Sequence, residues 1–124
     1  MTGSSNEMTD ADELSDYLFR VGDLHDCVID SMFWRPAEKR IEVRFADINA
    51  NFAGLPEYMG LAPCAMTVSG VDDVVLSVAS TDGRLKVHEA CASETTRGKL
   101  LKLRFSPSGS LEASFTTVTV VELT

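Results

Sequence analysis

The chain has 124 residues, of which 44% are hydrophobic and 24% are charged, and its net charge at pH 7 is −8. This length and composition fit one globular domain and exclude a collagen-like, a disulfide-stapled or a wholly disordered protein. The acidic balance argues against a general nucleic-acid binder, because such proteins use Lys and Arg to neutralise phosphates.

The acidic charge is concentrated near the N-terminus. Residues 1–26 hold seven acids and one base, a net charge of −6, which leaves −2 for the rest of the chain. We expect residues 1–9 to form a disordered, polar and acidic leader, followed by a single β-rich domain over residues 10–124. Such a leader either solubilises the protein or docks on a basic partner.

The sequence predicts a cytoplasmic protein that does not cross a membrane. Its first residues lack the basic and apolar regions of a secretory signal, and no apolar stretch approaches the ~18 residues of a membrane span. Cys27, Cys64 and Cys91 are odd in number and far apart, without a Cys-x-x-Cys motif. Reduced thiols fit this pattern better than disulfides or a structural zinc site.

One short helix is expected first, with Thr9 or Asp10 as its N-cap and Gly22 ending it. Acids in its first turn suit the positive end of the helix dipole. An apolar stripe follows helical spacing through Leu14, Tyr17, Leu18 and Val21. The helix is short, so it needs a surface to pack against.

The rest of the chain follows the two-residue alternation of β-strands. We predict about seven or eight short strands and therefore a mainly β fold, either an antiparallel sandwich or a partly open barrel. Hairpins are expected through residues 35–40, through 106–109 and at the Asp82-Gly83 pair, which is the strongest turn signal. The strand candidates cover residues 27–34, 41–45, 65–69, 71–80, 85–89, 101–105, 111–115 and 116–123.

Residues 46–64 form the least regular stretch of the chain. Connections of this length are uncommon in compact domains and often carry function. The stretch is too apolar for a solvated loop, so it either plugs one end of the sandwich or serves as a recognition loop. The candidate binding residues within it are Asn51, Phe52, Glu57 and Tyr58.

The two histidines of the chain limit the chemistry that it can perform. His25 lies between carboxylates in Asp23-Leu24-His25-Asp26, where it either binds a ligand or satisfies a backbone carbonyl in a turn. If Val87 and Glu89 share one face of their strand, His88 shares the other face with Lys86 and Ala90. A small-molecule or metal site near His25, Asp26 and His88 is the alternative function, although no spacing forces these residues to converge.

We expect no catalytic residues, no metal centre and no cofactor. The chain has no Gly-x-Ser-x-Gly elbow and no glycine-rich phosphate loop. Cys64 is a candidate nucleophile, but a free cysteine more often packs as a small hydrophobic residue.

A family resemblance runs through Leu24-His25-Asp26-Cys27-Val28-Ile29, Ile41-Glu42-Val43 and Val68-Ser69-Gly70-Val71. This order resembles small, mostly uncharacterised bacterial β-rich domains that open with an L-H-D-x-x-I turn and strand, some of which are grouped among toxin-immunity proteins. The resemblance implies a cytoplasmic binding protein without catalysis, in which the His-Asp turn is structural. In such proteins acidity suits a basic toxin, whereas here it lies mainly in the leader.

The function expected from the sequence is therefore that of a non-catalytic protein-interaction module. It would bind a protein partner or associate with itself, through a sheet face, an edge strand, the long loop or the leader.

Overall fold

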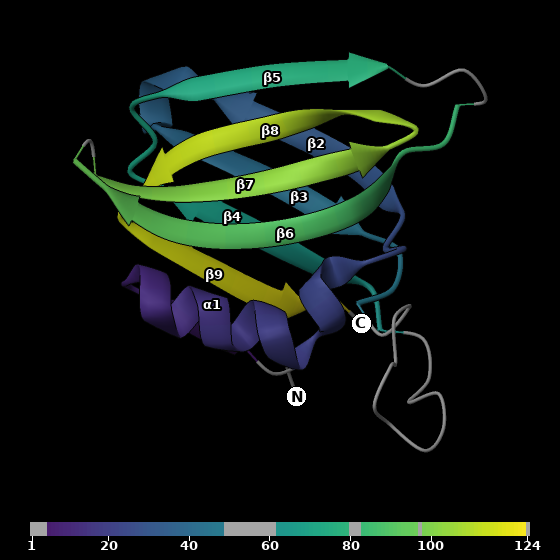
Figure 1. Ribbon diagram of the computed structural model, residues 1–124, viewed down its shortest axis with the longest axis horizontal. Helices are drawn as coiled ribbons and strands as arrows, with labels where there is room; N and C mark the ends of the chain where they lie inside the picture. Colours follow the sequence, from purple (N-terminus) through teal and green to yellow (C-terminus); the bar gives the residue numbers. More distant parts are fainter. Residues whose placement is uncertain (1–4, 49–61, 80–82, 97, 124) are drawn as a thin grey trace.

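Two antiparallel sheets pack face to face in the computed structural model, which describes residues 5–48, 62–79, 83–96 and 98–123 (Figure 1). The first sheet has the strand order β1-β9-β4-β3-β2 and the second has the order β5-β8-β7-β6. The predicted mainly β sandwich is confirmed, and within the described residues the two sheets do not close into a barrel. The strands are β1 (Ser5–Met8), β2 (Ile29–Arg35), β3 (Arg40–Phe45), β4 (Cys64–Ser69), β5 (Val74–Ala79), β6 (Lys86–Thr95), β7 (Gly98–Ser106), β8 (Ser108–Phe115) and β9 (Thr117–Glu122).

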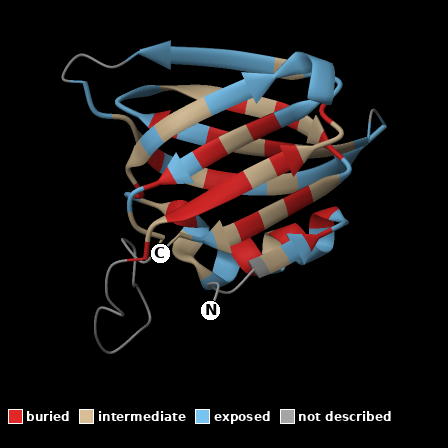
Figure 2. Ribbon diagram, turned by 180° about the vertical axis from the view of Figure 1, so that it is seen from behind, coloured by how far each residue is buried: buried red, intermediate tan, exposed pale blue. Residues whose placement is uncertain are grey.

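The core lies between the sheets and is built from the alternating positions of the central strands. On β3 the side chains of Ile41, Val43 and Phe45 are each at most 1% exposed. Their counterparts on the other sheet include Leu101 and Leu103 of β7, which are fully buried. Figure 2 shows this alternation as red and paler bands along the ribbons. Burial of these apolar side chains is the main source of stability.

The helix α1 (Ala11–Arg20) forms where its capping signal predicts it. The side chain of Asp10 accepts a hydrogen bond of 2.7 Å from the backbone N–H of Glu13. The Glu13 carboxylate in turn accepts a bond of 3.1 Å from the N–H of Thr9. Leu14, Tyr17 and Leu18 form the buried stripe, so both the predicted cap and the predicted apolar face are confirmed.

We expect Asp10→Ala to lower the free energy of unfolding by about 1 kcal/mol, because it removes the acceptor for an orphan N–H of the first helical turn. Asp10→Asn is the matched control, since an amide oxygen keeps the cap without the charge. Urea unfolding at pH 7 measures both variants. Equal losses in the two would contradict a capping role for this side chain.

The predicted disordered leader over residues 1–9 is wrong for its second half. Residues 5–8 form β1, which pairs antiparallel with β9 from Ser5 opposite Val121 to Met8 opposite Val118. Met8 is 4% exposed and belongs to the core. The β9 edge stabilises this strand, although the segment itself has no apolar alternation.

Two of the three predicted hairpins are confirmed. Strands β2 and β3 pair around the 3-10 turn η2 (Pro36–Glu38), and β7 pairs with β8 across residues 106–108. The hairpin expected at Asp82-Gly83 is wrong, because β5 and β6 lie at opposite edges of the second sheet with β8 and β7 between them. Among the described residues no helix has the length and apolar character to span a membrane.

Candidate interaction surface

One side of the sandwich is covered by α1. Figure 1 shows this helix below β6 and β9. At this margin β6 is the last strand of the second sheet, and β9 and β1 are the last two strands of the first sheet. The helix contacts β6 and β1, and the Ser15 hydroxyl donates a hydrogen bond of 3.3 Å to the carbonyl of Ala92 on β6. The buried stripe of α1 therefore closes this margin.

The opposite side carries most of the large apolar side chains that are exposed in the described residues. Five of the six residues of β5 are exposed. The large apolar ones among them are Val75, Leu76 and Val78, with exposed fractions of 60%, 49% and 48%. On β2, Trp34 is 56% exposed. We call these four residues the open edge.

Three of these side chains are exposed although their register directs them inward. Leu76 is opposite Leu111, and Trp34 is opposite Ile41, both of which are 1% exposed. Val78 has the same facing as Leu76, because residues two apart in a strand point to one side of the sheet. At the open edge, side chains that point between the two sheets are therefore left exposed to solvent.

The cause is the angle between the sheets. The rear strands run diagonally to the front strands, so the two sheets meet beside the start of β5 and diverge along it (Figure 1). At the meeting point Lys39 Nζ donates a bond of 2.9 Å to Asp72, and the Val71 N–H donates one of 2.9 Å to the Lys39 carbonyl. The hydrogen bond to Asp72 raises the pKa of Lys39, which keeps that ammonium charged. The rest of β5 extends beyond this contact.

At three alternate positions of β5 the backbone N–H and C=O groups also point toward the free side of the sheet. The Ser114 N–H donates a bond of 3.0 Å to the Asp73 carbonyl, which makes Asp73 and Ser114 a hydrogen-bonded pair of the β5–β8 ladder. Hydrogen-bonded and non-hydrogen-bonded pairs alternate along antiparallel strands. Val74, Leu76 and Val78 therefore direct their N–H and C=O groups away from β8, toward the free side of the sheet.

Of the other three edge strands, β6 is contacted by α1, and β1 and β2 carry features that discourage edge-to-edge pairing. β1 has four residues and includes Glu7, whereas β2 has a register shift between Ile29 and Ser31 and leads into Pro36. Short length, charge, bulges and proline are the usual protections of sheet edges. The sequence Val74–Ala79 contains no charged residue and no proline. Its register with β8 runs without a shift.

The predicted His25, Asp26 and His88 do come together. His25 Nδ1 donates a hydrogen bond of 2.6 Å to the carbonyl oxygen of His88, and the two rings meet edge to face with centroids 5.6 Å apart. His25 Nε2 lies 3.6 Å from Asp26 Oδ2. His25 therefore satisfies a backbone carbonyl, which is one of the two roles expected for it.

The turn that holds His25 is tied to β6 by its backbone. The turn includes the 3-10 segment η1 (Gly22–Leu24), and φ is positive at Asp23, Leu24 and Asp26, with values of 57°, 60° and 68°. Such conformations cost about 1–3 kcal/mol each and persist where surrounding contacts fix them. Those contacts are the buried side chain of Leu24 and the bond of 2.9 Å that Asp26 N–H donates to the Val87 carbonyl.

The geometry around His25 provides little for binding or catalysis. The side chains of His25 and Asp26 are 45% and 61% exposed. No group of three His, Cys, Asp or Glu side chains in the described part of the chain is placed to hold a metal ion. Cys64, the candidate nucleophile, is buried on β4, and burial raises the pKa of its thiol to about 12. The described residues thus show no activated nucleophile at this position.

The expectation that His88 and Ala90 share a strand face is wrong. The β6–β7 register shifts between Val87 and Glu89, so Val87 and Ala90 both point into the core while His88 is exposed. An extra residue in one strand reverses the alternation beyond it. The next residue, Glu89, accepts a bond of 2.8 Å from Arg104, which lowers the pKa of that carboxyl.

The remaining predicted binding residues, Asn51, Phe52, Glu57 and Tyr58, lie outside the described residues. Conversely, sequence reasoning did not single out the open edge. The available signal was the run Val74-Val75-Leu76-Ser77-Val78-Ala79, which is apolar on both faces. Such a run is typical of a strand that is covered on both faces, whereas β5 is largely exposed.

Comparison with protein-family models, with curated proteins and with solved structures finds no match to this chain. The interpretation of its function therefore rests on the geometry of the open edge and of the His25 turn.

Proposed function

We propose that this protein is a non-catalytic interaction module that binds a protein along the open edge. The observation that carries the proposal is the half-exposure of Trp34, Leu76 and Val78, whose register points them into the sandwich. Exposed apolar patches of this kind mark interaction sites. A strand or helix of the bound protein would cover the side chains of the open edge, as α1 covers the opposite margin of the sandwich.

Other features agree with a binding role in a reducing compartment. His25 is engaged with a backbone carbonyl, as expected if the Leu24-His25-Asp26 turn is structural and resembles that of immunity-like bacterial domains. Cys27, Cys64 and Cys91 are all in the thiol form, and Cys91 is exposed on β6. Free, exposed thiols persist in the cytoplasm, which is the compartment we propose.

Site-specific photo-crosslinking in the producing cells tests this function. A photo-reactive phenylalanine analogue in place of Leu76 or Trp34 is expected to give discrete crosslinks to protein. The control position is Phe19 on α1, which is 83% exposed and lies away from the open edge. Crosslinks from residues 34 and 76 but not from 19 support the proposal. Absence of crosslinks from residue 76, or an equal yield from residue 19, overturns it.

A further inference from the structure

We infer that the outer face of the first sheet carries a binding site for a phosphoryl group, between strands β2 and β3. The site is separate from the open edge, which shares none of its residues. It is a cavity of about 170 Å³ lined by Phe33, Arg35, Arg40, Glu42 and Arg44. We call it the arginine cavity.

The register of β2 and β3 gathers these side chains on one face. The burial pattern of β3 turns Arg40, Glu42 and Arg44 outward, because the residues that alternate with them are buried. On β2, Phe33 lies opposite Glu42, and Arg35 lies opposite Arg40. Directly opposed residues of antiparallel strands share a face of the sheet. All five side chains therefore project from the outer face.

Positive charge is in excess in the arginine cavity, although each arginine has a carboxylate nearby. Arg35 and Arg40 share the carboxylate of Glu38, which lies 3.6 Å from Nη1 of the first and 3.1 Å from Nη2 of the second. Arg44 donates its Nε–H to Glu42 over 2.8 Å. Three guanidinium groups thus meet two carboxylates. Like charges directly opposite each other destabilise a sheet, and a bound anion would relieve this cost between Arg35 and Arg40.

Most N–H groups of these arginines remain for a ligand. A guanidinium has five of them. Among the described residues, the one hydrogen bond that Arg44 makes uses its Nε–H, and the 3.6 Å ion pair of Arg35 is longer than a hydrogen bond. The Arg44 guanidinium also lies over the Phe33 ring, 5.8 Å from its centroid, so an aromatic surface supports it.

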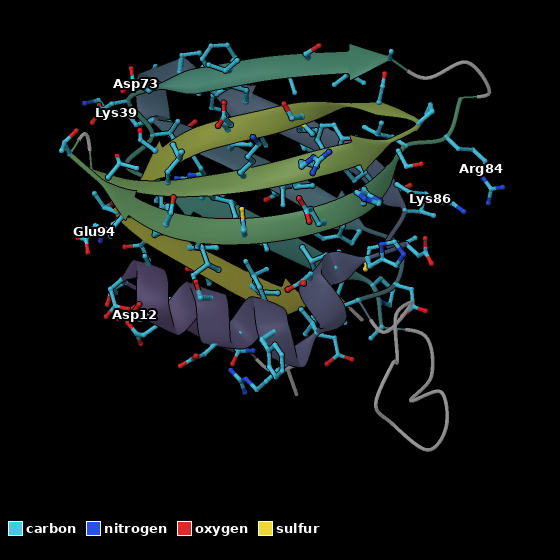
Figure 3. The ribbon with its side chains drawn as sticks, in the orientation of Figure 1. Asp12, Lys39, Asp73, Arg84, Lys86 and Glu94 are labelled. Atoms are coloured by element: carbon cyan, nitrogen blue, oxygen red, sulfur yellow. The ribbon has the colours of Figure 1, made fainter. Side chains whose placement is uncertain are left out.

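The neighbouring cation Lys39 does not belong to the arginine cavity. Its Nζ donates a bond of 2.9 Å to Asp72, and Figure 3 shows Lys39 at the end of the sandwich where β5 begins. The site therefore depends on guanidinium groups. Their planar forks match the oxygens of a phosphate in pairs, which the point charge of an ammonium does not.

Size and charge together select a phosphoryl group. The cavity of about 170 Å³ is smaller than the ~300 Å³ at which sites for drug-sized ligands begin. A phosphomonoester carries a charge of about −1.5 to −2 at pH 7 and three acceptor oxygens, enough for three guanidinium groups, whereas a carboxylate has two oxygens and one charge. Phe33 is 46% exposed, so its ring offers an apolar contact to the substituent of the ester. A small phosphate ester and a phosphorylated side chain share this chemistry.

NMR titration of the ¹⁵N-labelled chain at constant ionic strength tests the site. The probes are inorganic phosphate, phenyl phosphate and N-acetyl-phosphotyrosine amide, and N-acetyl-tyrosine amide is the control without phosphate. Saturable shifts of backbone amides on β2 and β3 are expected below about 10 mM of each phosphorylated probe. Tighter binding of the phosphotyrosine probe than of phenyl phosphate assigns the site to a phosphorylated side chain, and equal binding assigns it to a small ester.

Substitutions separate the cavity from general attraction to positive charge. Arg40→Gln and Arg44→Gln are each expected to weaken phenyl phosphate binding at least tenfold, because each removes one fork. Arg104→Gln is the matched control and is expected to change the affinity less than about twofold. Arg104 also pairs with a strand carboxylate, that of Glu89 over 2.8 Å, but it does not line the cavity. Phe33→Ala is expected to weaken phenyl phosphate and to spare inorganic phosphate.

Absence of saturable shifts on β2 and β3 up to about 10 mM of every phosphorylated probe overturns the inference. Equal weakening in Arg104→Gln also overturns it, as does unchanged affinity in both Arg40→Gln and Arg44→Gln. The amide spectrum of each variant verifies that the fold is kept. Failure of this site leaves the proposed function standing, because the crosslinks from the open edge are measured separately.

Discussion

Gly109→Ala is expected to lower the free energy of unfolding by about 2–5 kcal/mol, because it adds strain and a steric clash at one position. Gly109 lies on β8 opposite Val78 with φ at +112°, a conformation that residues with a side chain rarely adopt. A Cβ built there lies 2.2 Å from the Ser77 carbonyl oxygen, so the backbone of β5 must move away from β8. The substitution is therefore also expected to disturb the pairing of β5 with β8, and with it the positions of the open-edge side chains on β5.

Gly98→Ala separates the two contributions. Gly98 has nearly the same φ, +108°, but a Cβ there meets nothing within 4 Å. It is expected to cost only the backbone strain, about 1–3 kcal/mol. Urea unfolding of both variants at pH 7 measures the difference. Equal losses would contradict the close approach of β5 to Gly109.

Alkaline pH is expected to destabilise the protein strongly between pH 9 and about 12. Burial raises the pKa of the Cys64 thiol from 9.0 to about 12, and burial also raises the pKa of the Tyr17 hydroxyl above its ordinary 10.0. Both groups ionise more readily in the unfolded chain. Their stabilising contribution is complete below pH 9 and is lost as the pH rises toward the folded values. The combined loss by pH 11 is about 4 kcal/mol, at about 1.4 kcal/mol per pKa unit.

Urea midpoints in reducing buffer from pH 7.5 to 11 measure this loss. Cys64→Ala is expected to flatten the decline, because it removes one of the two groups. Cys91→Ala is the matched control, since Cys91 is exposed. The same decline in Cys64→Ala and in the wild-type chain would show that this thiol does not contribute.

The sequence predicted those parts of the fold that depend on local pattern. The alternation at Ile41, Val43 and Phe45 and the cap at Asp10 are signals within a few residues, and both appear as expected. The strand over residues 5–8 was missed because Met8 is the one buried residue among residues 6–8, and its pairing depends on β9 at the far end of the chain.

The wrong hairpin prediction and the overlooked open edge also depend on contacts between segments that are far apart in the sequence. The Asp82-Gly83 pair is a local hairpin signal, but β8 supplies the partner of β5 and β7 that of β6. A local turn preference does not determine which distant strand a segment pairs with. The open edge could not be identified from the sequence for this reason, because the exposure of Leu76 depends on strand order and on the angle between sheets.

Amide hydrogen exchange on β5 tests most directly whether a protein covers the open edge. In the complex with a partner identified by crosslinking at residue 76, the outward-facing N–H groups of Leu76 and Val78 are expected to exchange as slowly as that of Ser77, which points to β8. In the isolated chain Leu76 and Val78 should exchange faster while Ser77 stays slow. Equally fast exchange of Leu76 and Val78 with and without the partner would contradict the proposed function.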